Sequence, residues 1–496
     1  MNYLSQDMET QPGAAALPEK VLQFGTGVLL RGLPDYLIDK ANRQGLFNGR
    51  IVVVKSTDGG DINAFSRQDG LYTLCIRGVA DGQTVEENVV CSAISRVLSA
   101  KSQWADVLRV ARTPELQVVI SNTTEVGIQL VSESIQQTPP HSFPGKLLAV
   151  LYARYQAFDG ALDKGLVIVP TELIPNNGSK LEGIVLELAH LNGLDADFIE
   201  WLEAANHFCN SLVDRIVPGR PDAATQAALE EELGYSDDLL TMSEAYLLWA
   251  IEGDERVRQV LSFEQVDAGV VIQPDINQFR ELKLRMLNGT HTLSCGLALL
   301  SGFDTVRGAM DDEVLGSYIT SLMQDNLRAG IPYPVADEVS REFGRQVLDR
   351  FRNPFVEHRW LGITLNYTAK LQMRAVATLV QYAERYQKVP QCAAVGFAAY
   401  LLFMRGTRQQ DHTWYGELNG EEYPIQDEKA GYFADLWQRL TPAELTTTVL
   451  RNQALWHHDL TTLPGFAPQV AAYLEQMLEQ GVYATVASHL NAQVSA

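Results

Sequence analysis

Three polar side chains lie at short spacing near the middle of the chain: Lys283, Asn288 and His291. On an α-helix, which advances about 100° per residue, His291 lies about 80° and Asn288 about 140° from Lys283, so the three share one broad face. A lysine beside an amide and an imidazole can transfer protons, because burial and neighbouring dipoles lower its pKa from about 10.4 towards neutrality. The amide would donate to a developing alkoxide or carbonyl oxygen. This spacing indicates acid–base chemistry at an oxygen.

A simpler interpretation of these residues is a solvated helix face. Lysine, asparagine and histidine are common on exposed helices, and their spacing alone does not separate a catalytic face from a solvated one. The choice between the two depends on the elements that would position the three side chains and on the other motifs in the chain.

A glycine-rich turn lies near the start of the chain. Gly25-Thr26-Gly27 follows the apolar run 21–24 and precedes a helical pattern that continues to Leu37. Glycines at such a turn let the backbone approach a pyrophosphate, and the helix N-terminus supplies unpaired N–H groups. Because the next glycine is Gly32, the spacing of a dinucleotide fingerprint is imperfect, and a simple turn without a cofactor is an open alternative.

The second predicted strand, residues 51–54, leads into Lys55-Ser56-Thr57-Asp58. An NAD enzyme presents an acid near this point to the ribose hydroxyls, and Asp58 is the candidate. Lys55 would equally suit the 2′-phosphate of NADP. The residues alone therefore leave the choice between NAD and NADP open.

The pattern of elements predicts two domains. Residues 1–275 predict a dinucleotide-binding α/β domain of Rossmann-like class, whose mostly parallel sheet carries helices on both faces. After residue 275 apolar residues recur at helical spacing and strand patterns disappear, so residues 276–496 predict a mainly α-helical substrate-binding and catalytic domain. Within it, residues 367–386 predict one long amphipathic helix. Strands are predicted at residues 21–24, 51–54, 116–121, 166–170 and 266–272.

Composition disfavours several functional classes. The 496 residues include 39 Lys+Arg and 61 Asp+Glu, and the net charge of −22 disfavours nucleic acid and anionic lipid as partners. The polar start has no secretory signal, and the longest apolar run, residues 393–404, predicts a buried helix too short to span a membrane. Five scattered cysteines form no Cys/His cluster, so no disulfide or zinc site is expected. We expect a cytoplasmic protein that binds a small molecule.

Longer motifs resemble the long-chain polyol dehydrogenase family typified by mannitol 2-dehydrogenase. The resemblance extends over nearly the whole chain in the same order. The KxxxxNxxH element is quite specific to the family, whereas the GxG turn is not. The motifs are QFGTG at 23–27 with Arg31, DGLYT at 69–73, SNTTE at 121–125, TELIPNNG at 171–178, LVDRIVPG at 212–219, KxxxxNGTH at 283–291 and RFRNPFVEH at 350–358.

The resemblance implies an oxidoreductase that uses NAD and needs no metal, because a lysine and two amides replace the Lewis acid. It implies that Lys283 is the general acid/base and that Asn288 and Asn177 hold the reacting oxygen. His291 would position Lys283 and touch substrate. The cofactor contacts expected from the motifs are Gly25, Thr26, Gly27, Arg31, Asp58, Ser121, Asn122 and Thr123.

Within the family the chain is most similar to members that act on sugar acids. The resemblance places Asp214 near the substrate hydroxyls and Lys370 in contact with substrate. Polyol-acting relatives carry arginine where this chain has Gly362, which disfavours a neutral polyol. A carboxylate substrate in so acidic a protein requires a local cationic pocket. The candidates for it are Arg352, Arg359, Lys370 and Arg374.

Three alternatives follow from the same residues: an enzyme for a related sugar acid, an enzyme for a neutral polyol, and a dinucleotide-binding sensor without catalysis. Joint retention of Lys283, Asn288 and His291 argues against the sensor, because a protein without catalysis needs none of them. The sequence leaves open whether the protein is a monomer or a small homo-oligomer.

Overall fold

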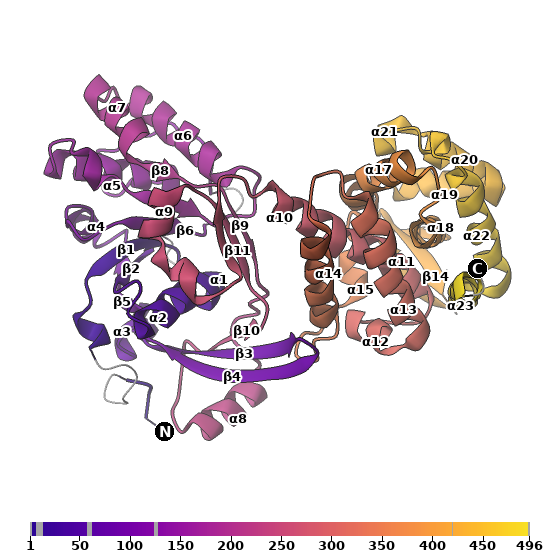
Figure 1. Ribbon diagram of the computed structural model, residues 1–496, viewed down its shortest axis with the longest axis horizontal. Coiled ribbons are helices and arrows are strands. Elements are labelled where there is room, and N and C mark those ends of the chain that lie inside the picture. The colour runs from indigo at the N-terminus through magenta and orange to yellow at the C-terminus, as the bar shows by residue number, and fades with distance from the viewer. Residues whose placement is uncertain (1, 6–12, 57–61, 124–126, 419, 495–496) are drawn as a thin grey trace. The chain divides into compact units, whose positions relative to one another are not determined.

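The computed structural model describes residues 2–5, 13–56, 62–123, 127–418 and 420–494. The chain divides into two compact units (Figure 1): residues 1–78 with 84–276, and residues 79–83 with 277–496. The predicted boundary after residue 275 lies next to this division. The sequence does not predict that residues 79–83, the tip of a β-hairpin, group with the second unit.

A six-stranded sheet forms the centre of the first unit, and all its paired strands are parallel. In spatial order the strands are β5 (Ile94–Ser99), β2 (Arg50–Lys55), β1 (Glu19–Phe24), β6 (Val118–Ser121), β7 (Val167–Pro170) and β8 (His207–Phe208). Along the chain, β2 and β5 are added to one side of β1, and β6, β7 and β8 are then added to its other side. In such sheets ligands bind outside the carboxyl ends of the strands at this switch point, here between β1 and β6.

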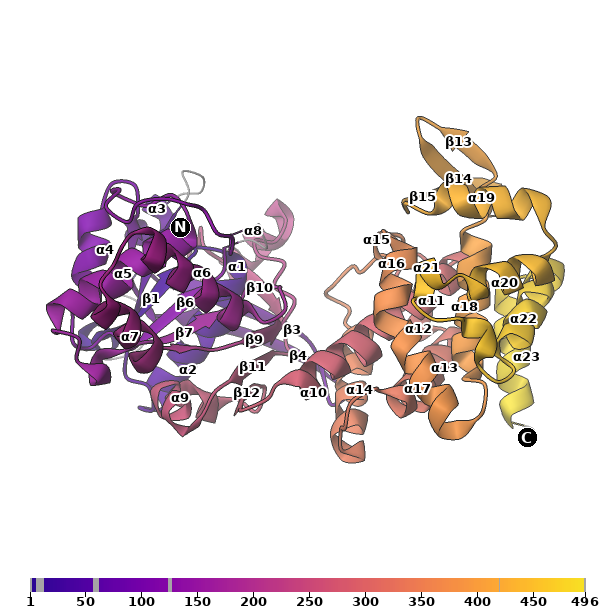
Figure 2. The ribbon, with the colours of Figure 1, turned by 90° about the horizontal axis from the view of Figure 1, so that it is seen from above.

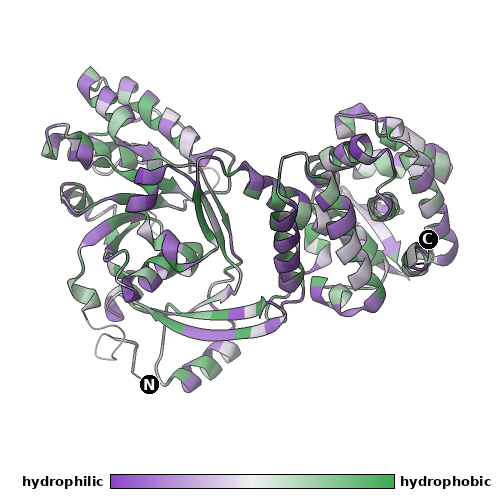
Figure 3. Ribbon diagram, viewed as in Figure 1, coloured by the Kyte–Doolittle hydropathy of each residue, from purple (hydrophilic) through white to green (hydrophobic). Residues whose placement is uncertain are grey.

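Helices cover both faces of the sheet, because successive side chains of each buried strand point to opposite faces. From β1, Val21 packs into a cluster that contains Leu33, whereas Phe24 packs into a second cluster that contains Leu147. In Figure 3 the outer helices of this unit alternate between hydrophobic and hydrophilic stretches. The helices are α1 (Val28–Leu30), η2 (Arg31–Asp35) and α2 (Tyr36–Arg43) on one face, and α4 (Trp104–Ala111), α5 (Phe143–Ala157), α6 (Asn177–Leu191) and α7 (Ala196–Ala205) on the other.

Two smaller sheets complete the first unit. One contains β10 (Thr241–Glu244), β3 (Tyr72–Ala80) and β4 (Gln83–Cys91), and the other contains β12 (Val270–Gln273), β11 (Leu248–Glu252) and β9 (Ser211–Asp214). The strand predicted at residues 266–272 is only partly correct, because the chain forms the 3-10 turn η4 (Ser262–Val266) first and β12 pairs outside the main sheet. The remaining helices are η1 (Ala14–Ala16), α3 (Ile62–Arg67), η3 (Leu162–Lys164), α8 (Ala223–Leu233) and α9 (Glu255–Val260).

The second unit is mainly helical, and with the first unit this confirms the predicted fold class. One expectation is wrong: strands do not end near residue 275, because β13 (Arg408–Gln410), β14 (Thr413–Leu418) and β15 (Glu421–Ile425) form an antiparallel sheet. The helices along the chain are α10 (Asn277–Glu281), η5 (Leu282–Asn288), α11 (Gly289–Leu300), α12 (Val306–Asp311), α13 (Glu313–Ser321), η6 (Leu322–Leu327), η7 (Arg328–Gly330), α14 (Asp337–Phe351), α15 (Trp360–Ile363), α16 (Tyr367–Leu371), η8 (Gln372–Val376), α17 (Ala377–Tyr386), α18 (Gln391–Phe403), α19 (Ala430–Arg439), α20 (Pro442–Arg451), α21 (Gln453–Trp456), η9 (Leu460–Thr462), α22 (Phe466–Gln480) and α23 (Val482–Val494).

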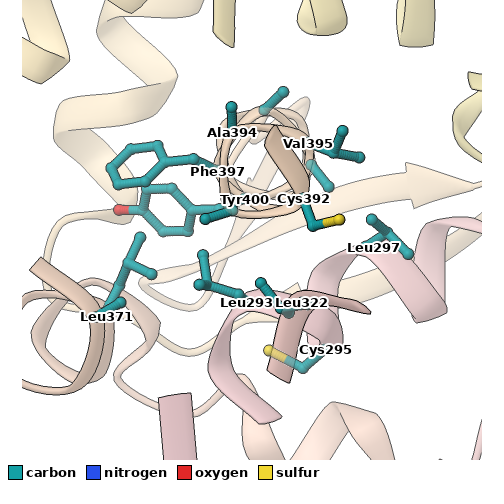
Figure 4. Packing of buried hydrophobic residues seen from close by; sticks show 14 of the residues in the cluster. Leu293, Cys295, Leu297, Leu322, Leu371, Cys392, Ala394, Val395, Phe397 and Tyr400 are labelled. Atoms are coloured by element: carbon teal, nitrogen blue, oxygen red, sulfur yellow. The ribbon is translucent and has the colours of Figure 1, made fainter. Parts of the chain in front are cut away.

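Helix α18 is the centre of this unit's core, as predicted for the apolar run 393–404. Figure 2 shows α11 and α18 in the middle of the unit, and α18 packs against both α11 and α22. In Figure 4, Phe397 and Tyr400 lie on one side of α18 towards Leu371, while Cys392 lies on another side towards Leu297. Apolar side chains thus surround the helix. No helix in the described ranges is both long and apolar enough to cross a membrane.

Four of the described helical segments are π-helical: η2, η5, η6 and η8. Hydrogen bonds in a π-helix join residues five apart, and such turns are rare and frequent at functional sites. The helix predicted at residues 367–386 is continuous, but η8 interrupts its α-helical geometry between α16 and α17. In the second unit η5 contacts both η6 and η8. Two of the predicted catalytic residues, Lys283 and Asn288, lie in η5 within this cluster of π turns.

Candidate active site

Gly25 shapes the turn after β1. Its φ is +133°, which L-residues rarely adopt, and a Cβ there would lie 2.8 Å from the carbonyl oxygen of Asn122. Backbone hydrogen bonds join the turn to both neighbouring strands, because Gly25 N–H donates to Val54 O and Asn122 N–H donates to Phe24 O, each at 3.1 Å. A Cβ at Gly27 would meet no atom within 4 Å, so the turn is open where the helix begins. An open backbone at a helix N-terminus fits a pyrophosphate.

Arg31 supports this turn from the inside. Its buried guanidinium donates from Nη1 to the carbonyl oxygen of Thr26 at 2.9 Å and from Nε to Thr241 Oγ1 at 3.2 Å. It also lies 5.7 Å from the ring centre of Phe65 and 5.9 Å from that of Tyr72. Burial lowers the pKa of Arg31 below its usual value. The predicted cofactor residue therefore fixes Thr26 in place from beneath the turn.

Glu172, which follows β7, forms hydrogen bonds with residues at and just after the end of β6. Its carboxylate accepts from Ser121 Oγ at 3.1 Å and from the N–H and Oγ1 of Thr123 at 2.8 and 3.0 Å. Asn122 donates from Nδ2 to Thr171 Oγ1 at 3.0 Å. Burial raises the pKa of Glu172, although these hydrogen bonds partly offset the effect. The sequence analysis missed Glu172, for which the signal is an acid two residues after a buried strand.

Asp58 lies outside the described residues. Strand β2 ends at Lys55, which is half-buried. The proposed contact between an acid and the ribose hydroxyls is thus untested, and so is the choice between NAD and NADP.

Asn177 is fully buried at the start of α6, and its amide is committed to the backbone. Nδ2 lies 3.0 to 3.1 Å from the carbonyl oxygens of Pro170, Glu172 and Ser211. Oδ1 accepts from the N–H of Gly178 at 2.9 Å and of Ser211 at 2.8 Å. In this arrangement both amide hydrogens point to backbone carbonyl oxygens. The residue thus joins β7, β9 and α6, and its role as a donor to the reacting oxygen stays a prediction.

Asp214 is buried at the end of β9, where it pairs with Leu248 of β11 in the antiparallel ladder. The next residue, Arg215, is also buried and donates to the carbonyl oxygen of Glu244 from Nε at 3.1 Å and Nη2 at 2.9 Å. These contacts fix the position of Asp214 within the first unit. Its role near substrate hydroxyls stays a prediction.

The helix that carries Lys283 and Asn288 is not a regular α-helix. Both residues lie in η5, at whose end the N–H of Gly289 bonds to the carbonyl oxygen of Leu284, five residues earlier. In a π turn residues five apart occupy one face, as residues four apart do in an α-helix. Lys283 and Asn288 therefore lie on the same face, and the 140° separation expected for an α-helix is wrong. Both side chains are half-buried.

His291 lies in an aromatic pocket one turn further along, in α11. It is 8% exposed, and its ring stacks on Phe351 at 4.3 Å and meets His358 edge-on at 4.8 Å. Burial lowers the pKa of His291 well below its usual value, and the neighbouring His358 and Arg350 add to the effect. The imidazole is therefore neutral at pH 7. Its Nε2 is buried without a hydrogen-bond partner.

Two of the four cations proposed for a substrate carboxylate lie close together on α16 and η8. Lys370 is half-buried and donates from Nζ to the carbonyl oxygen of Ile363 at 3.1 Å. Burial lowers the pKa of Lys370, and the positive charge of Arg374 lowers it further. Arg374 donates from Nη1 to Thr292 Oγ1 at 3.1 Å. The structure thus brings Lys370 and Arg374 together.

The other two cations are exposed. Arg359 forms an ion pair with Glu357 at 2.6 Å, and Arg352 lies at the end of α14. Gly362 lies in α15 and is exposed, and a Cβ there would meet no atom within 4 Å. It adjoins Ile363, whose carbonyl oxygen accepts from Lys370. A side chain at position 362 would therefore start beside the anchor of Lys370.

Arg285 and Glu281 are further residues that the sequence analysis missed. Arg285 is buried in η5, donates from Nε to Glu281 Oε2 at 2.8 Å, and donates from Nη1 to the carbonyl oxygen of Met373 at 2.6 Å. The i,i+4 spacing of an acid and an arginine indicates an ordinary surface pair, so the spacing carries no signal of the second contact. In the described part of the chain no three His, Cys, Asp or Glu side chains are grouped to hold a metal.

The chain matches known proteins along almost its whole length. Residues 19–265 match the mannitol dehydrogenase Rossmann domain and residues 275–478 match the mannitol dehydrogenase C-terminal domain. The altronate oxidoreductase of Halalkalibacterium halodurans is 38% identical over 96% of this chain and 94% of its own length. That of Bacillus subtilis is 38% identical over 94% of both chains, and that of Yersinia enterocolitica is 37% identical over 95% and 97%.

Two solved structures share the fold. Mannitol 2-dehydrogenase of Pseudomonas fluorescens, in a ternary complex with NAD and D-mannitol, has a TM-score of 0.66 at 22% identity and covers 99% of this chain and 100% of its own. A substrate-free D-sorbitol dehydrogenase has a TM-score of 0.75 at 20% identity, with 98% and 100% covered. At these identities the likeness concerns the fold alone.

Proposed function

Since this chain belongs to the mannitol dehydrogenase family, we propose that it interconverts D-tagaturonate and D-altronate with NAD as the cofactor, a step in the breakdown of hexuronates. The relatives that match at 37–38% identity over nearly full length are named altronate oxidoreductase. The reaction reduces the ketone of a sugar acid to a secondary alcohol, or reverses that step. It requires a hydride carrier, a proton donor and a cation for the carboxylate.

The observation that carries this proposal is the π turn that aligns Lys283 with Asn288. A ketone oxygen that accepts hydride at its carbon gains negative charge and needs both a proton and a hydrogen-bond donor. Lys283 Nζ supplies the proton in reduction and removes the hydroxyl proton in oxidation. The Asn288 amide donates to the same oxygen. Because the two side chains lie on one helix face, a single oxygen can contact both.

His291 completes this arrangement as a neutral wall. Its pKa is lowered well below the usual value by burial, so it adds no charge that would repel a protonated Lys283. Stacking on Phe351 fixes the plane of the ring. A fixed neutral imidazole can orient the lysine or a substrate hydroxyl by hydrogen bonding. We therefore retain His291 as a residue that positions the reacting groups.

The turn after β1 fits a nicotinamide dinucleotide. Gly25 keeps the backbone clear of a side chain, Gly27 leaves the helix start open, and Arg31 holds Thr26 from beneath. The N–H groups at the start of the helix Val28–Arg43 would bind the pyrophosphate. When bound, the nicotinamide supplies or accepts the hydride. We assign the ribose hydroxyls to Asp58, which favours NAD over NADP.

Lys370 is the best of the four cations for the substrate carboxylate. Arg359 is paired with Glu357, and Arg374 uses Nη1 on Thr292. Lys370 is half-buried and donates one N–H to a backbone carbonyl, so two of its three N–H donors can reach a carboxylate. All five cysteines are buried free thiols, which supports a reducing compartment such as the cytoplasm.

The proposal is tested by following the absorbance of NADH with tagaturonate, fructuronate and fructose as substrates. We expect tagaturonate to have the highest kcat/KM, NADH to be preferred to NADPH, and Lys283→Ala to be inactive. A higher kcat/KM with fructuronate or fructose would replace the substrate and leave the acid–base site in place. If NADH binds but no ketone is reduced, the protein is a dinucleotide sensor and the proposal is wrong.

A further inference from the structure

Two arginines of the second unit form a reciprocal contact that the acid–base chemistry does not use. Arg285, in η5, donates from Nη1 to the carbonyl oxygens of Met373 at 2.6 Å and Arg374 at 3.3 Å, both in η8. In return, Arg374 donates from Nη1 to Thr292 Oγ1 at 3.1 Å, in the α-helix directly after η5. We call Arg285, Arg374 and Thr292 the arginine clasp.

The clasp reaches both ends of the π turn. At the start, Glu281 Oε2 accepts from Arg285 Nε at 2.8 Å. At the end, the Thr292 hydroxyl donates to the carbonyl oxygen of Asn288 at 2.8 Å. The side chain of Arg285 is 10% exposed and that of Glu281 is 22% exposed. Ion pairs on open helix surfaces contribute little, whereas this pair lies mostly inside the protein and continues into backbone hydrogen bonds.

A π turn needs such support from outside the helix. Its hydrogen bonds join residues five apart instead of four, and such turns are rarer than α turns. The change of spacing leaves backbone carbonyls without their usual partner. A buried carbonyl without a donor is costly. A guanidinium offers five N–H donors in a rigid plane and is suited to satisfy two carbonyls at once. Arg285 does this for η8 while it belongs to η5.

We propose that Arg285 and Arg374 are positioning residues, which hold η5 in its π conformation and thereby keep Lys283 and Asn288 on one face. This rests on the proposed function, in which those two residues contact the reacting oxygen. Without the clasp the turn relaxes towards α-helical spacing, which places Asn288 about 140° from Lys283. Misplacement of a reacting group by about 1 Å lowers a rate by about 10²-fold.

The first test compares steady-state kinetics of four variants. Arg285→Met should lower kcat about 10²-fold and change KM less than about threefold, because the clasp acts on the reacting pair and not on substrate binding. Arg285→Lys keeps the charge beside Glu281 and should regain about tenfold of that loss. Glu281→Gln should lower kcat by less, about five- to tenfold. Arg307→Met removes an exposed i,i+4 arginine paired with Asp311 and should change nothing.

The second test does not depend on the substrate. Backbone hydrogen exchange is measured by mass spectrometry on wild type and Arg285→Met. Faster exchange confined to peptides over residues 282–292 and 370–377 supports the clasp, whereas faster exchange throughout the second unit overturns it in favour of a general structural role. An unchanged kcat in Arg285→Met also overturns it. If Arg285→Met does not fold, Glu281→Gln is measured by both methods, and normal kcat with normal exchange there overturns the proposal. If wild type does not reduce tagaturonate, the proposed function fails, and exchange still decides the clasp.

Discussion

The two regions that carry the predicted site residues are built in opposite ways. In the first unit the polar side chains of the motifs turn inward and bond to the backbone, as Arg31 does to Thr26 and Asn177 does to three carbonyl oxygens. In the second unit the helix backbone itself departs from α geometry, and this places Lys283 and Asn288 on one face. We therefore expect substitutions in the first unit to change ligand affinity or stability, and substitutions in the second unit to change the rate of the chemical step.

The largest effect is expected for Lys283→Met. Removal of the general acid/base should lower kcat/KM by about 10⁴-fold, the upper end of what general acid–base catalysis contributes. NADH affinity, measured by fluorescence titration, should stay within about twofold of wild type. Lys388→Met, at an exposed position after α17, is the matched control and should be fully active. If Lys283→Met kept an activity within tenfold of wild type, the rate of the chemical step would not depend on this residue of the second unit. The contrast between the two units would then fail.

Asn288→Ala comes next. Loss of one hydrogen-bond donor to a developing oxyanion costs about 10² to 10³ in kcat, while the midpoint of thermal unfolding should change little because Asn288 is half-buried. Both quantities come from initial rates and a thermal melt of the same preparation. A large fall in the midpoint of thermal unfolding together with the loss of rate would show that Asn288 supports the fold. The contrast with Asn177 would then disappear.

Gly25→Ala tests the turn of the first unit. The backbone angle and the 2.8 Å approach to Asn122 O disfavour any side chain, and strain of this kind is about 1 to 3 kcal/mol. We expect the Kd for NADH to rise about 10- to 100-fold, with kcat at saturating cofactor nearly unchanged. Gly183→Ala is the control, because a Cβ there meets no atom within 4 Å. A fall in kcat without a change in Kd would contradict the expected division between the units.

Asn177→Ala should act on stability. Five backbone groups lie within hydrogen-bond distance of this buried amide, and loss of their partner should lower the free energy of unfolding by about 3 kcal/mol. Urea unfolding gives that quantity, and kcat per folded molecule should stay within about threefold. A selective loss of kcat with normal stability would instead support the predicted role of Asn177 as a donor to the reacting oxygen.

The pH dependence of stability is expected to involve Asp35, a buried acid of η2 near the turn. Burial raises the pKa of Asp35 to about 7, although the hydrogen bond from Gln23 at 3.3 Å opposes this. Since the folded protein holds this proton more tightly than the unfolded chain, whose value is 3.8, stability falls as pH rises from about 4 to about 7 and is level above. Each unit of pKa corresponds to about 1.4 kcal/mol.

Asp35→Asn removes this titration and should make the stability curve flatter. Urea unfolding of wild type and Asp35→Asn at several pH values isolates the effect, because all other groups titrate in both. If the free energies of unfolding of wild type and Asp35→Asn differed by a constant amount from pH 4 to pH 8, the titration of Asp35 would lie outside this range. Such a result would also show that Asp35 does not link the stability of the first unit to pH.

The sequence predicts the elements that are long, buried and regular. Strands β2, β6 and β7 contain continuous apolar runs, β1 ends in a buried run interrupted by one polar residue, and α18 is almost entirely apolar, so local patterns suffice. The hairpin β3–β4 and the sheet β13–β15 are missed, because β4 and β13 are largely exposed and polar. Exposed polar strands lack the alternation on which a strand prediction depends.

Site geometry was predictable only in part, for a related reason. The identity of Lys283, Asn288 and His291 follows from residue types and motifs, but their angular relation does not, because the π turn depends on contacts with η6 and η8 that are distant in sequence. For Asn177, the motif identifies the residue but does not show whether its side chain faces a ligand or the backbone. Glu172 is missed for a similar reason, because its contacts with Ser121 and Thr123 join separate strands.

The π turn also has a consequence for how the gene can vary. In a π turn a spacing of five residues is geometrically equivalent to a spacing of four in an α-helix. Loss of one codon between Lys283 and Asn288 would therefore leave an ordinary helix in which the lysine and the amide still share a face. The segment before the lysine would keep nearly the same angular position relative to α11, because the two spacings turn the helix by about the same angle. A one-residue gap at this place in an alignment would thus mark a change in helix type, and would not by itself mark the loss of the reacting pair.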